Sequence, residues 1–523
     1  MTATLFVADA VHGHVGARGV VVRENRITAV VGDRELRRVG TTVGEVIELG
    51  GHVYPGFTDA HSHPSLGAGL QRGVDLSDVD DLAALRSVLS DAVREIPPGE
   101  WLLGWGLSYG LWDDDQPTSA VLRGLGRPVA LQLFDCHALL LDEEAVRVAG
   151  VERMPAFGSG AHAVRDERGA FTGLVVEEEA MDHVRLAIPP EHPASRTDRL
   201  GRVLAAMAAS GLTGLHVMDA LGDSAEQYDE LERTGRLPLR LKLHRWYTPA
   251  LAAAGVDPVD PPPGRGRLWH HHGVKLFLDG TVDNGTAWLS SPDLRGESTG
   301  STWGDPVEYA RVVQRLAAAG VPTATHAIGD AAILWAADTI ARAHAAHPAV
   351  RHRIEHLEVT SPAAVAAVGR SGAVASVQPT HCTRFVAADG SDNWSRRLGD
   401  RRSHGWRLRS LAASGTVLAL GSDFPIAPFE PLGILADAVS RRCTARGGEA
   451  VSPLEALGAD EAVLAYTVGA ALAAGVEHDE GTIAPGRLAD LSVFDGDLSA
   501  ATPEQLLTRR AVATVVDGEF RRS

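Results

Sequence analysis

The sequence predicts an α/β protein built on a TIM-type (β/α)8 barrel. Eight short apolar runs, rich in β-branched residues, are spread along most of the chain as buried parallel strands would be. Several runs carry or lead into a histidine, lysine or aspartate, and barrel enzymes place their chemistry at the C-terminal ends of their strands. Eight strands are enough to close a barrel. The expected strands are residues 56–61, 212–218, 239–244, 274–278, 322–326, 352–356, 374–378 and 417–421.

A long insertion is predicted between the first two strands. They are separated by about 150 residues, whereas the loops of a βα unit usually take 2–6. The inserted segment, from about residue 70 to 186, contains an amphipathic stretch and an aromatic cluster with Trp101, Trp105 and Trp112. We expect it to form a cap over the mouth of the barrel. The alternative for two of the three tryptophans is that they pack the core of the cap itself.

Composition indicates a globular enzyme of more than one structural unit. The chain has 523 residues, of which 45% are hydrophobic and 22% charged, so disorder is not indicated. A net charge of −18 argues against nucleic acids and anionic membranes as partners. Cys136, Cys382 and Cys443 are too few for a disulfide framework. Residues 1–7 lack the features of a signal peptide or membrane span, so we expect a cytoplasmic location.

The pair His61 and His63 lies at the end of the first expected strand. On a strand, residues two apart point to the same side, so both imidazoles can face one ion. Such a pair is half of a zinc-type site. The alternative is a turn with two solvated histidines.

Four further residues follow later strands in a suitable order. They are Lys275, His326, His356 and Asp423, and Lys275 is one of only two lysines in the chain. Lys242, the other, lies on the expected third strand. The alternative for Lys275 is a buried ion pair with Asp279 or Asp283, and for Asp423 a turn or N-cap role.

This ordered set resembles the amidohydrolase superfamily, whose ligands are His-x-His, Lys, His, His and Asp on strands one, four, five, six and eight. The branch that it resembles is amidohydrolase-3, which includes N-substituted formamide deformylases. Residues 372–381, 421–425 and 481–491 are similar to further segments of that branch. The resemblance therefore covers nearly the whole chain.

The resemblance implies a domain organisation and a metal centre. Residues 1–54 and 477–523, both strand-like, would form one β-sandwich, and residues 55–476 the barrel with its cap. His61, His63 and Asp423 would hold one divalent ion, most plausibly zinc, and His326 and His356 a second. A neutral lysine amine can add carbon dioxide, which arginine cannot, so carboxylated Lys275 would bridge the ions.

The function that follows is hydrolysis of a C–N bond in an amide, formamide or cyclic amide by a metal-activated hydroxide. Asp423 would move the proton from the attacking water to the leaving nitrogen. Two alternatives stay open: a mononuclear deaminase of a nitrogen heterocycle, and a non-catalytic scaffold with an amidohydrolase-like fold. Lys275 favours the hydrolase, because deaminases of this type lack that lysine.

The substrate is expected to be a small molecule, and a homodimer is the candidate assembly. Side chains from the cap and the seventh strand are weaker candidates for contacting the substrate, with packing as the alternative. In the tract 270–272, at most one histidine can reach an ion because successive strand residues alternate faces. The weaker substrate candidates are His381, Asp135, His137, Trp105 and Trp112.

Overall fold

The computed structural model describes residues 3–112, 116–157, 160–260, 264–442 and 448–522. In this part of the chain, the central sheet has eight strands, and all neighbouring pairs are parallel. The N–H of Asp423 donates to the His61 carbonyl at 2.7 Å, and that of His63 to the Phe424 carbonyl at 2.8 Å. These bonds join the two edges, so the predicted barrel is confirmed. Its strands are β7 (Phe57–Ser62), β14 (Leu212–Ala220), β15 (Arg240–Trp246), β16 (Trp269–Phe277), β17 (Thr323–Ala327), β18 (Arg353–His356), β19 (Val374–Val377) and β20 (Leu418–Leu420).

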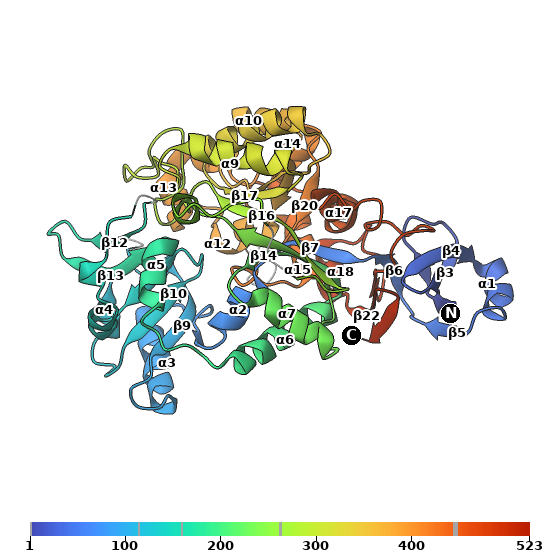
Figure 1. Cartoon of the computed structure of the whole chain (residues 1–523), viewed down its shortest axis with the longest axis horizontal. Coiled ribbons are helices and arrows are strands. Elements are labelled where there is room, and N and C mark those ends of the chain that lie inside the picture. Colours follow the sequence, from blue (N-terminus) through green and yellow to red (C-terminus); the bar gives the residue numbers. More distant parts are fainter. Residues whose placement is uncertain (1–2, 113–115, 158–159, 261–263, 443–447, 523) are drawn as a thin grey trace.

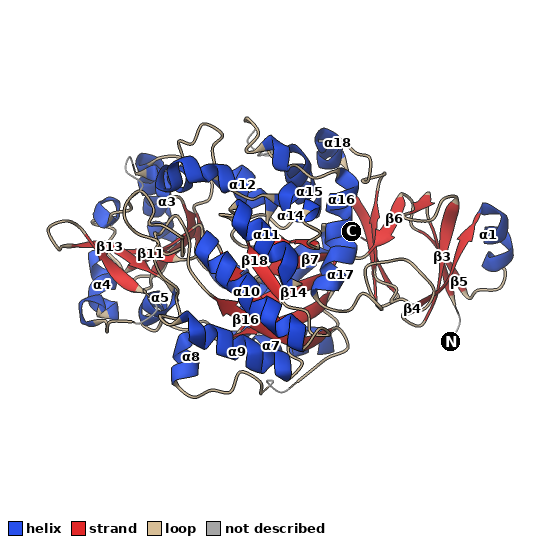
Figure 2. Cartoon of the chain, turned by 90° about the horizontal axis from the view of Figure 1, so that it is seen from above, coloured by secondary structure: helices blue, strands red, loops and turns tan. Residues whose placement is uncertain are grey.

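Helices cover the outside of the barrel (Figure 2). Residue spacing explains their packing: α10 buries Ile333, Ala336, Ile340 and Ala343, which recur every three or four residues and so share one face. None of the described helices is both long and apolar enough to cross a membrane. The helices that accompany the barrel are α2 (Pro64–Leu70), α6 (Pro193–Ala209), α7 (Ser224–Arg233), α8 (Pro249–Ala253), α9 (Pro306–Ala318), α10 (Asp330–Ala346), α11 (Pro362–Ser371), α12 (Pro379–Phe385), α13 (Asn393–Leu398), α14 (Leu408–Ala413), α15 (Pro431–Ser440), α16 (Ala459–Leu464), α17 (Ala470–Ala473) and α18 (Pro503–Thr508).

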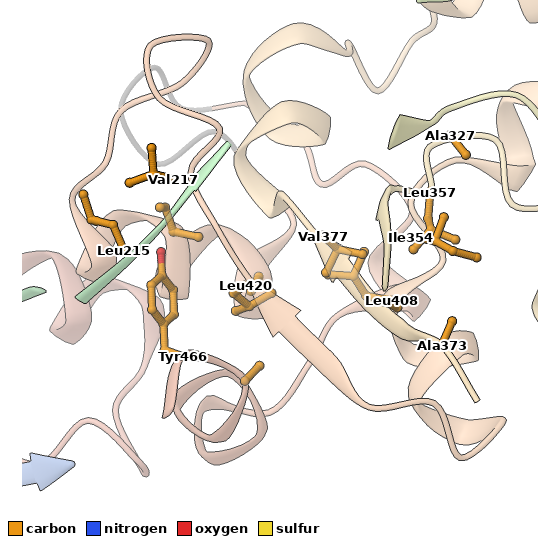
Figure 3. Packing of buried hydrophobic residues seen from close by; sticks show 14 of the residues in the cluster. Leu215, Val217, Ala327, Ile354, Leu357, Ala373, Val377, Leu408, Leu420 and Tyr466 are labelled. Atoms are coloured by element: carbon orange, nitrogen blue, oxygen red, sulfur yellow. The ribbon is translucent and has the colours of Figure 1, made fainter. Parts of the chain in front are cut away.

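The main hydrophobic core lies between the barrel strands and these helices. Leu215, Ile354, Val377 and Leu420 point outward from four strands into this layer, where Tyr466 also lies (Figure 3). Each is buried, and burial of such a side chain contributes about 1.5–3 kcal/mol. Because alternate strand residues point to opposite sides, the residues between them face into the barrel.

The barrel interior is polar. Arg353 of β18 donates to Nδ1 of His216 on β14 at 2.7 Å and to the carbonyl of Ala60 on β7. Neither strand is a neighbour of β18 in the sheet, so the arginine reaches across the barrel. Arg353 also donates to Glu355 Oε2 at 2.9 Å and to Ser376 at 2.8 Å. This buried network fixes the carboxylate of Glu355 beneath the ends of the strands.

The inserted segment forms a separate sheet and core beside the barrel mouth, at the left of Figure 1. Its described strands have the order β12-β13-β11-β10-β9-β8, with helices on them. Asp142 caps α4 by accepting from the N–H of Ala145, a typical N-cap bond. The elements are β8 (Val74–Asp75), α3 (Leu82–Glu95), β9 (Leu102–Leu107), β10 (Val129–Leu133), β11 (Ala138–Leu141), α4 (Glu143–Ala149), β12 (His162–Arg165), β13 (Phe171–Val176) and α5 (Glu178–Arg185).

The two ends of the chain meet in the remaining sheets, at the right of Figure 1. Strand β6 near the N-terminus pairs antiparallel with β21 near the C-terminus, and one apolar cluster contains Phe6, Val53, Leu491 and Val515. The predicted strand-rich opening also contains a helix, α1, which the sequence analysis did not predict. The elements are β1 (Thr4–Val7), β2 (Ala10–Val11), β3 (Ala17–Arg23), β4 (Arg26–Gly32), α1 (Asp33–Gly40), β5 (Glu45–Glu48), β6 (His52–Pro55), β21 (Leu491–Phe494), β22 (Ala511–Val516) and β23 (Glu519–Arg522).

Candidate metal centre

The six residues predicted as metal ligands lie together at the C-terminal end of the barrel. They come from β7, β16, β17, β18 and the segments that follow β7 and β20, and parallel strands bring these ends to one face. All six are at least nine-tenths buried. They are His61, His63, Lys275, His326, His356 and Asp423.

Three of these side chains converge on one point. Nε2 of His61 lies 3.2 Å from Nε2 of His63 and 3.2 Å from Oδ1 of Asp423, and Nε2 of His63 lies 3.0 Å from the same oxygen. Nδ1 of His356 lies 3.9 Å from Oδ2 of Asp423. Among the described residues, His61, His356 and Asp423 place ligand atoms within 4.8 Å of one another, as one ion requires.

Lys275 and His326 lie next to these residues. Nζ of Lys275 lies 3.3 Å from Nε2 of His61 and over the ring of Phe277. The rings of His326 and His356 have centroids 4.4 Å apart, and Nε2 of His326 lies 3.1 Å from the Gly280 carbonyl. If that nitrogen carries the proton, Nδ1 of His326 is the free ligand atom. The alternative ion pair for Lys275 is not formed with Asp279, which accepts backbone N–H groups from Trp288, Ile328 and Gly329.

Glu355 orients the first histidine. Its Oε2 lies 2.5 Å from Nδ1 of His61, so that nitrogen faces the carboxylate and Nε2 faces the cluster. Metal-bound histidines commonly use their second nitrogen in this way. Burial alone would raise the pKa of Glu355, but Arg353 and His61 outweigh it and hold that pKa below its usual range. Glu355 therefore stays ionised beneath the site.

The backbone around the site is fixed by a second buried carboxylate. Asp59 of β7 accepts from the N–H groups of His61 and Ser422, each at 3.0 Å, and so joins the first strand to the exit of the last. Asp423 itself has a φ of 58° and His356 a φ of 72°, in the left-handed region that non-glycine residues seldom adopt. Such backbone conformations are kept only where the surrounding structure determines them, and they cluster at functional sites.

The charge states fit a divalent cation. Burial lowers the pKa values of His61, His326 and His356, so these imidazoles are neutral donors. Burial also lowers the pKa of Lys275 to about 8. For Asp423, burial acts in the raising direction, but His61 and His63 outweigh it and keep the pKa well below its ordinary value. Neutral imidazoles beside an ionised carboxylate are a donor set that zinc and similar ions use.

The residues predicted to contact the substrate lie in several different places. Nε2 of His381 lies 3.6 Å from Oδ2 of Asp423, and the ring of His137 lies 5.5 Å from that of His326, so both adjoin the ligand cluster. Asp135 lines the same cavity, but its Oδ2 accepts from Tyr109, Thr281 and Asn284 and thereby ties the cap to the barrel.

Trp105 and Trp112 are not among the residues that line the cavity at the ligand cluster. Trp112 is buried in an apolar cluster of the cap, which is the alternative role left open for it. Trp105 borders a smaller neighbouring pocket of about 440 Å³.

A cavity of about 840 Å³ opens above the ligand cluster between the cap and the barrel. Most of its wall is apolar or aromatic, and several carboxylates border it. Sequence reasoning missed Glu355, Asp59 and Glu358 in or beneath this site. The signal available for Glu355 was its spacing of two from Arg353, because two polar residues at that spacing on a buried strand must both face the barrel interior. The aromatic residues that line the cavity are Phe134, Trp246, Phe277, Phe385, Trp394 and Trp406.

The barrel and the imidazole and carboxylate groups at its C-terminal end define a class of protein, the metal-dependent hydrolases. The chain belongs to the amidohydrolase family, whose sequence model matches residues 45–521. The predicted family is thus confirmed.

Individual relatives cover almost the whole chain. An N-substituted formamide deformylase of Arthrobacter pascens is 28% identical over 97% of this chain and 95% of its own, and YtcJ, an amidohydrolase-like protein of Bacillus subtilis, is 28% identical over 93% and 92%. A metal-dependent hydrolase of uncharacterised function from Pyrococcus furiosus has a TM-score of 0.66 at 25% identity, with 93% of this chain and 97% of its own covered.

Proposed function

We propose that this protein hydrolyses the C–N bond of an amide, formamide or cyclic amide with the help of two divalent cations, for which zinc suits the mixed nitrogen and oxygen donors. The observation that carries the proposal is the buried amine of Lys275, 3.3 Å from Nε2 of His61 among neutral imidazoles. An ammonium at this position would repel a cation. A carbamate there would bind one.

Carbamate formation joins Nζ of Lys275 to the carbon of carbon dioxide and releases one proton from the amine. Burial supports this step, since it lowers the pKa of Lys275 to about 8 and so enlarges the neutral fraction at neutral pH. In the proposal, His61, His63 and Asp423 would hold one ion, His326 and His356 would hold the other, and carboxylated Lys275 would supply oxygen ligands. Such ions supply Lewis acidity and make water a better nucleophile at neutral pH.

The protein's own groups handle the proton and the substrate. Asp423 accepts the proton of the attacking water and delivers it to the nitrogen that leaves as the C–N bond breaks. His381, at 3.6 Å from Asp423, stands beside this carboxylate on the cavity wall and is placed to contact the substrate. His137 approaches His326 from the cap and is held by Glu177 at 3.0 Å. The cap therefore contributes to the pocket as well as covering it.

A mononuclear deaminase is the second candidate function. It is favoured by the tight convergence of His61, His356 and Asp423, which is sufficient for a single ion. In that case Lys275 would remain an amine. The deformylase from Arthrobacter pascens favours the first candidate, because its name describes removal of a formyl group from nitrogen.

The deciding experiment is elemental analysis of metal per chain on protein purified without chelator, followed by assays with N-formyl, N-acyl and cyclic amides. Two ions per chain and release of amine from a formamide would support the two-ion hydrolase. One ion per chain, with ammonia released from a heterocycle, would favour the deaminase. No bound metal after supplementation would favour a non-catalytic scaffold.

A further inference from the structure

The cavity contains a buried carboxylate that the proposed chemistry does not use. Glu358 lies two residues beyond β18, is only 8% exposed, and lines the cavity. Its Oε2 accepts from Nε1 of Trp394 at 3.1 Å. Its Oε1 accepts no hydrogen bond from any residue in the described ranges, and the nearest charged or ring partner is Nδ1 of His381 at 3.8 Å. Because Glu358 lines the cavity, this oxygen can accept a hydrogen bond from a ligand there.

Two tryptophans lie beside Glu358. Trp394 and Trp406 have ring centroids 4.6 Å apart, and both line the cavity. The indole N–H of Trp394 donates to the Glu358 carboxylate, whereas the backbone N–H of Trp406 donates to the backbone carbonyl of Glu358 at 2.8 Å. Phe385 borders the same region. A carboxylate in a cavity lined by aromatic rings is an arrangement that binds organic cations, by charge-assisted hydrogen bonding and cation–π attraction.

The arginines that line the cavity are already paired with carboxylates. Of the arginines that line it, Arg185 donates to Glu178 at 2.6 Å and to Asp182 at 3.0 Å, and Arg196 donates to Asp223. Lys275 belongs to the ligand cluster. Both arginines that line the cavity thus already have carboxylate partners, whereas Oε1 of Glu358 accepts no hydrogen bond within the described residues.

We propose that Glu358, held by the indole of Trp394, binds a positively charged amine on the substrate, so that the enzyme acts on amides of cationic amines and discriminates against amides that carry a carboxylate. The proposal rests on the C–N hydrolysis proposed above. His381 lies between Glu358 and Asp423, at 3.8 Å and 3.6 Å. The cationic nitrogen would therefore be separated from Asp423 by the ring of His381. This separation suits a diamine in which one nitrogen is acylated and the other carries the charge.

Three substrates of nearly equal shape test the proposal: N-benzylformamide and its para-aminomethyl and para-carboxylate derivatives. The expected order of kcat/KM is cation, then neutral, then anion. Glu358→Gln keeps the side-chain shape and an acceptor for Trp394 but removes the charge. It should lower the ratio of kcat/KM between the cationic and neutral substrates about tenfold, the effect of losing one charge-assisted hydrogen bond.

Glu179→Gln is the matched control, since it removes the same charge from another residue lining the cavity. It should change the ratio of kcat/KM between the cationic and neutral substrates by no more than about twofold. An equal drop of this ratio in both variants would show that the preference comes from the negative potential of the whole cavity, and it would overturn the role of Glu358. An unchanged ratio in Glu358→Gln, with both substrates slowed alike, would instead assign Glu358 to holding His381 and would also overturn the proposal.

Calorimetry of amine binding separates this proposal from the proposed reaction. Metal-loaded protein should bind 1,4-bis(aminomethyl)benzene about tenfold more tightly than benzylamine, and Glu358→Gln should remove the difference. If no formamide is hydrolysed but this preference holds, C–N hydrolysis fails and the cation site stands. If all three formamides are hydrolysed at equal rates and the amines bind equally, the cation site fails and the hydrolase stands.

Discussion

The proposed two-ion mechanism depends on the side chain of Lys275. Lys275→Ala should lower the metal content from two ions per chain to about one, because the bridging group is lost. Asp423→Asn should retain the fold but cannot accept a proton. Turnover should fall by about a hundredfold or more in both variants, as expected for loss of a general acid–base group or a metal bridge. Elemental analysis and steady-state kinetics on the same preparations measure both effects.

Lys242 provides the matched control for Lys275, since the chain has no other lysine. Both lysines are buried on neighbouring barrel strands. Nζ of Lys242 forms an ion pair with Glu480 at 2.7 Å, whereas Nζ of Lys275 lies beside His61. Lys242→Ala should therefore keep its full metal content. Near-normal turnover in Lys275→Ala or Asp423→Asn would contradict the mechanism.

Asp283, at the cavity wall, should make stability depend on pH. Burial, with Asp135 and Glu358 adding to it, raises the pKa of Asp283 from 3.8 to about 8. Because the folded pKa lies above the unfolded one, the folded state binds this proton more tightly, and its stabilisation is lost as pH rises from about 4 to about 8. Asp283→Asn removes the titration. Its Tm should rise relative to the unmodified protein between about pH 5.5 and pH 8.

The control for this pH effect is Asp229→Asn, which removes a carboxylate from an exposed helix position. Its Tm difference from the unmodified protein should stay constant over the same pH range. A constant difference for Asp283→Asn as well would show that Asp283 is ionised throughout and would contradict its raised pKa.

At the residue scale, sequence patterns predicted the residues of the candidate metal centre but not the residues that support them. Each of these residues except Lys275 lies at or just after the end of an apolar run, which the sequence alone shows; they are His61, His63, His326, His356 and Asp423. The roles of Glu355 and Glu358 depend on contacts with residues far away in the chain, such as His61, Trp394 and Trp406. No local pattern contains those contacts, so only the folded structure reveals them.

At the scale of elements, all eight predicted barrel strands overlap observed ones. Each of these buried strands is a short run rich in apolar residues and bounded by turn signals, which makes it conspicuous in the sequence. β16 starts five residues earlier than predicted because the tract His270–His272 continues the strand. Helix α1 was missed because five of its eight residues are charged and none is buried, so the pair Leu36 and Val39, which packs on a small apolar cluster, gives a weak helical pattern.

A stacked pair of aromatic rings joins two elements at the cavity wall. Phe134 follows β10 of the cap and Phe385 ends α12, and their centroids are 4.1 Å apart. Both rings border the main cavity and the smaller pocket next to it. Phe134→Ala should connect the two spaces. The kcat/KM for a biphenyl formamide should then rise by roughly tenfold relative to N-benzylformamide, the scale on which pocket size discriminates apolar groups.

Phe171→Ala is the control for pocket size, because Phe171 is a half-buried phenylalanine of the cap that borders neither space. It should leave the ratio of the two substrates unchanged. A similar rise in both variants would attribute the effect to loosening of the cap, and no rise in Phe134→Ala would show that the ring pair does not limit substrate size.

At the scale of the whole molecule, ion pairs join the barrel to the C-terminal segment. Arg240 of β15 donates to Asp490 at 2.6 Å, and Lys242 of the same strand to Glu480 at 2.7 Å. Breaking a buried pair by removing one partner costs about 3–5 kcal/mol, because the other charge stays buried. Lys242→Met should therefore lower the Tm markedly. The double variant Lys242→Met with Glu480→Leu should recover most of the loss, and equal Tm values for the single and double variants would contradict this coupling.

The closure of the barrel also sets when the site can exist during synthesis. His61 belongs to the first barrel strand and Asp423 follows the last, and the hydrogen bond between their backbones joins the two edges of the sheet. A nascent chain still attached to the ribosome before residue 423 has emerged holds the histidine pair without its carboxylate or its final neighbouring strand. If the proposed metal centre forms, the ion that needs both His61 and Asp423 can therefore be captured only by the nearly finished polypeptide, after most of its translation is over.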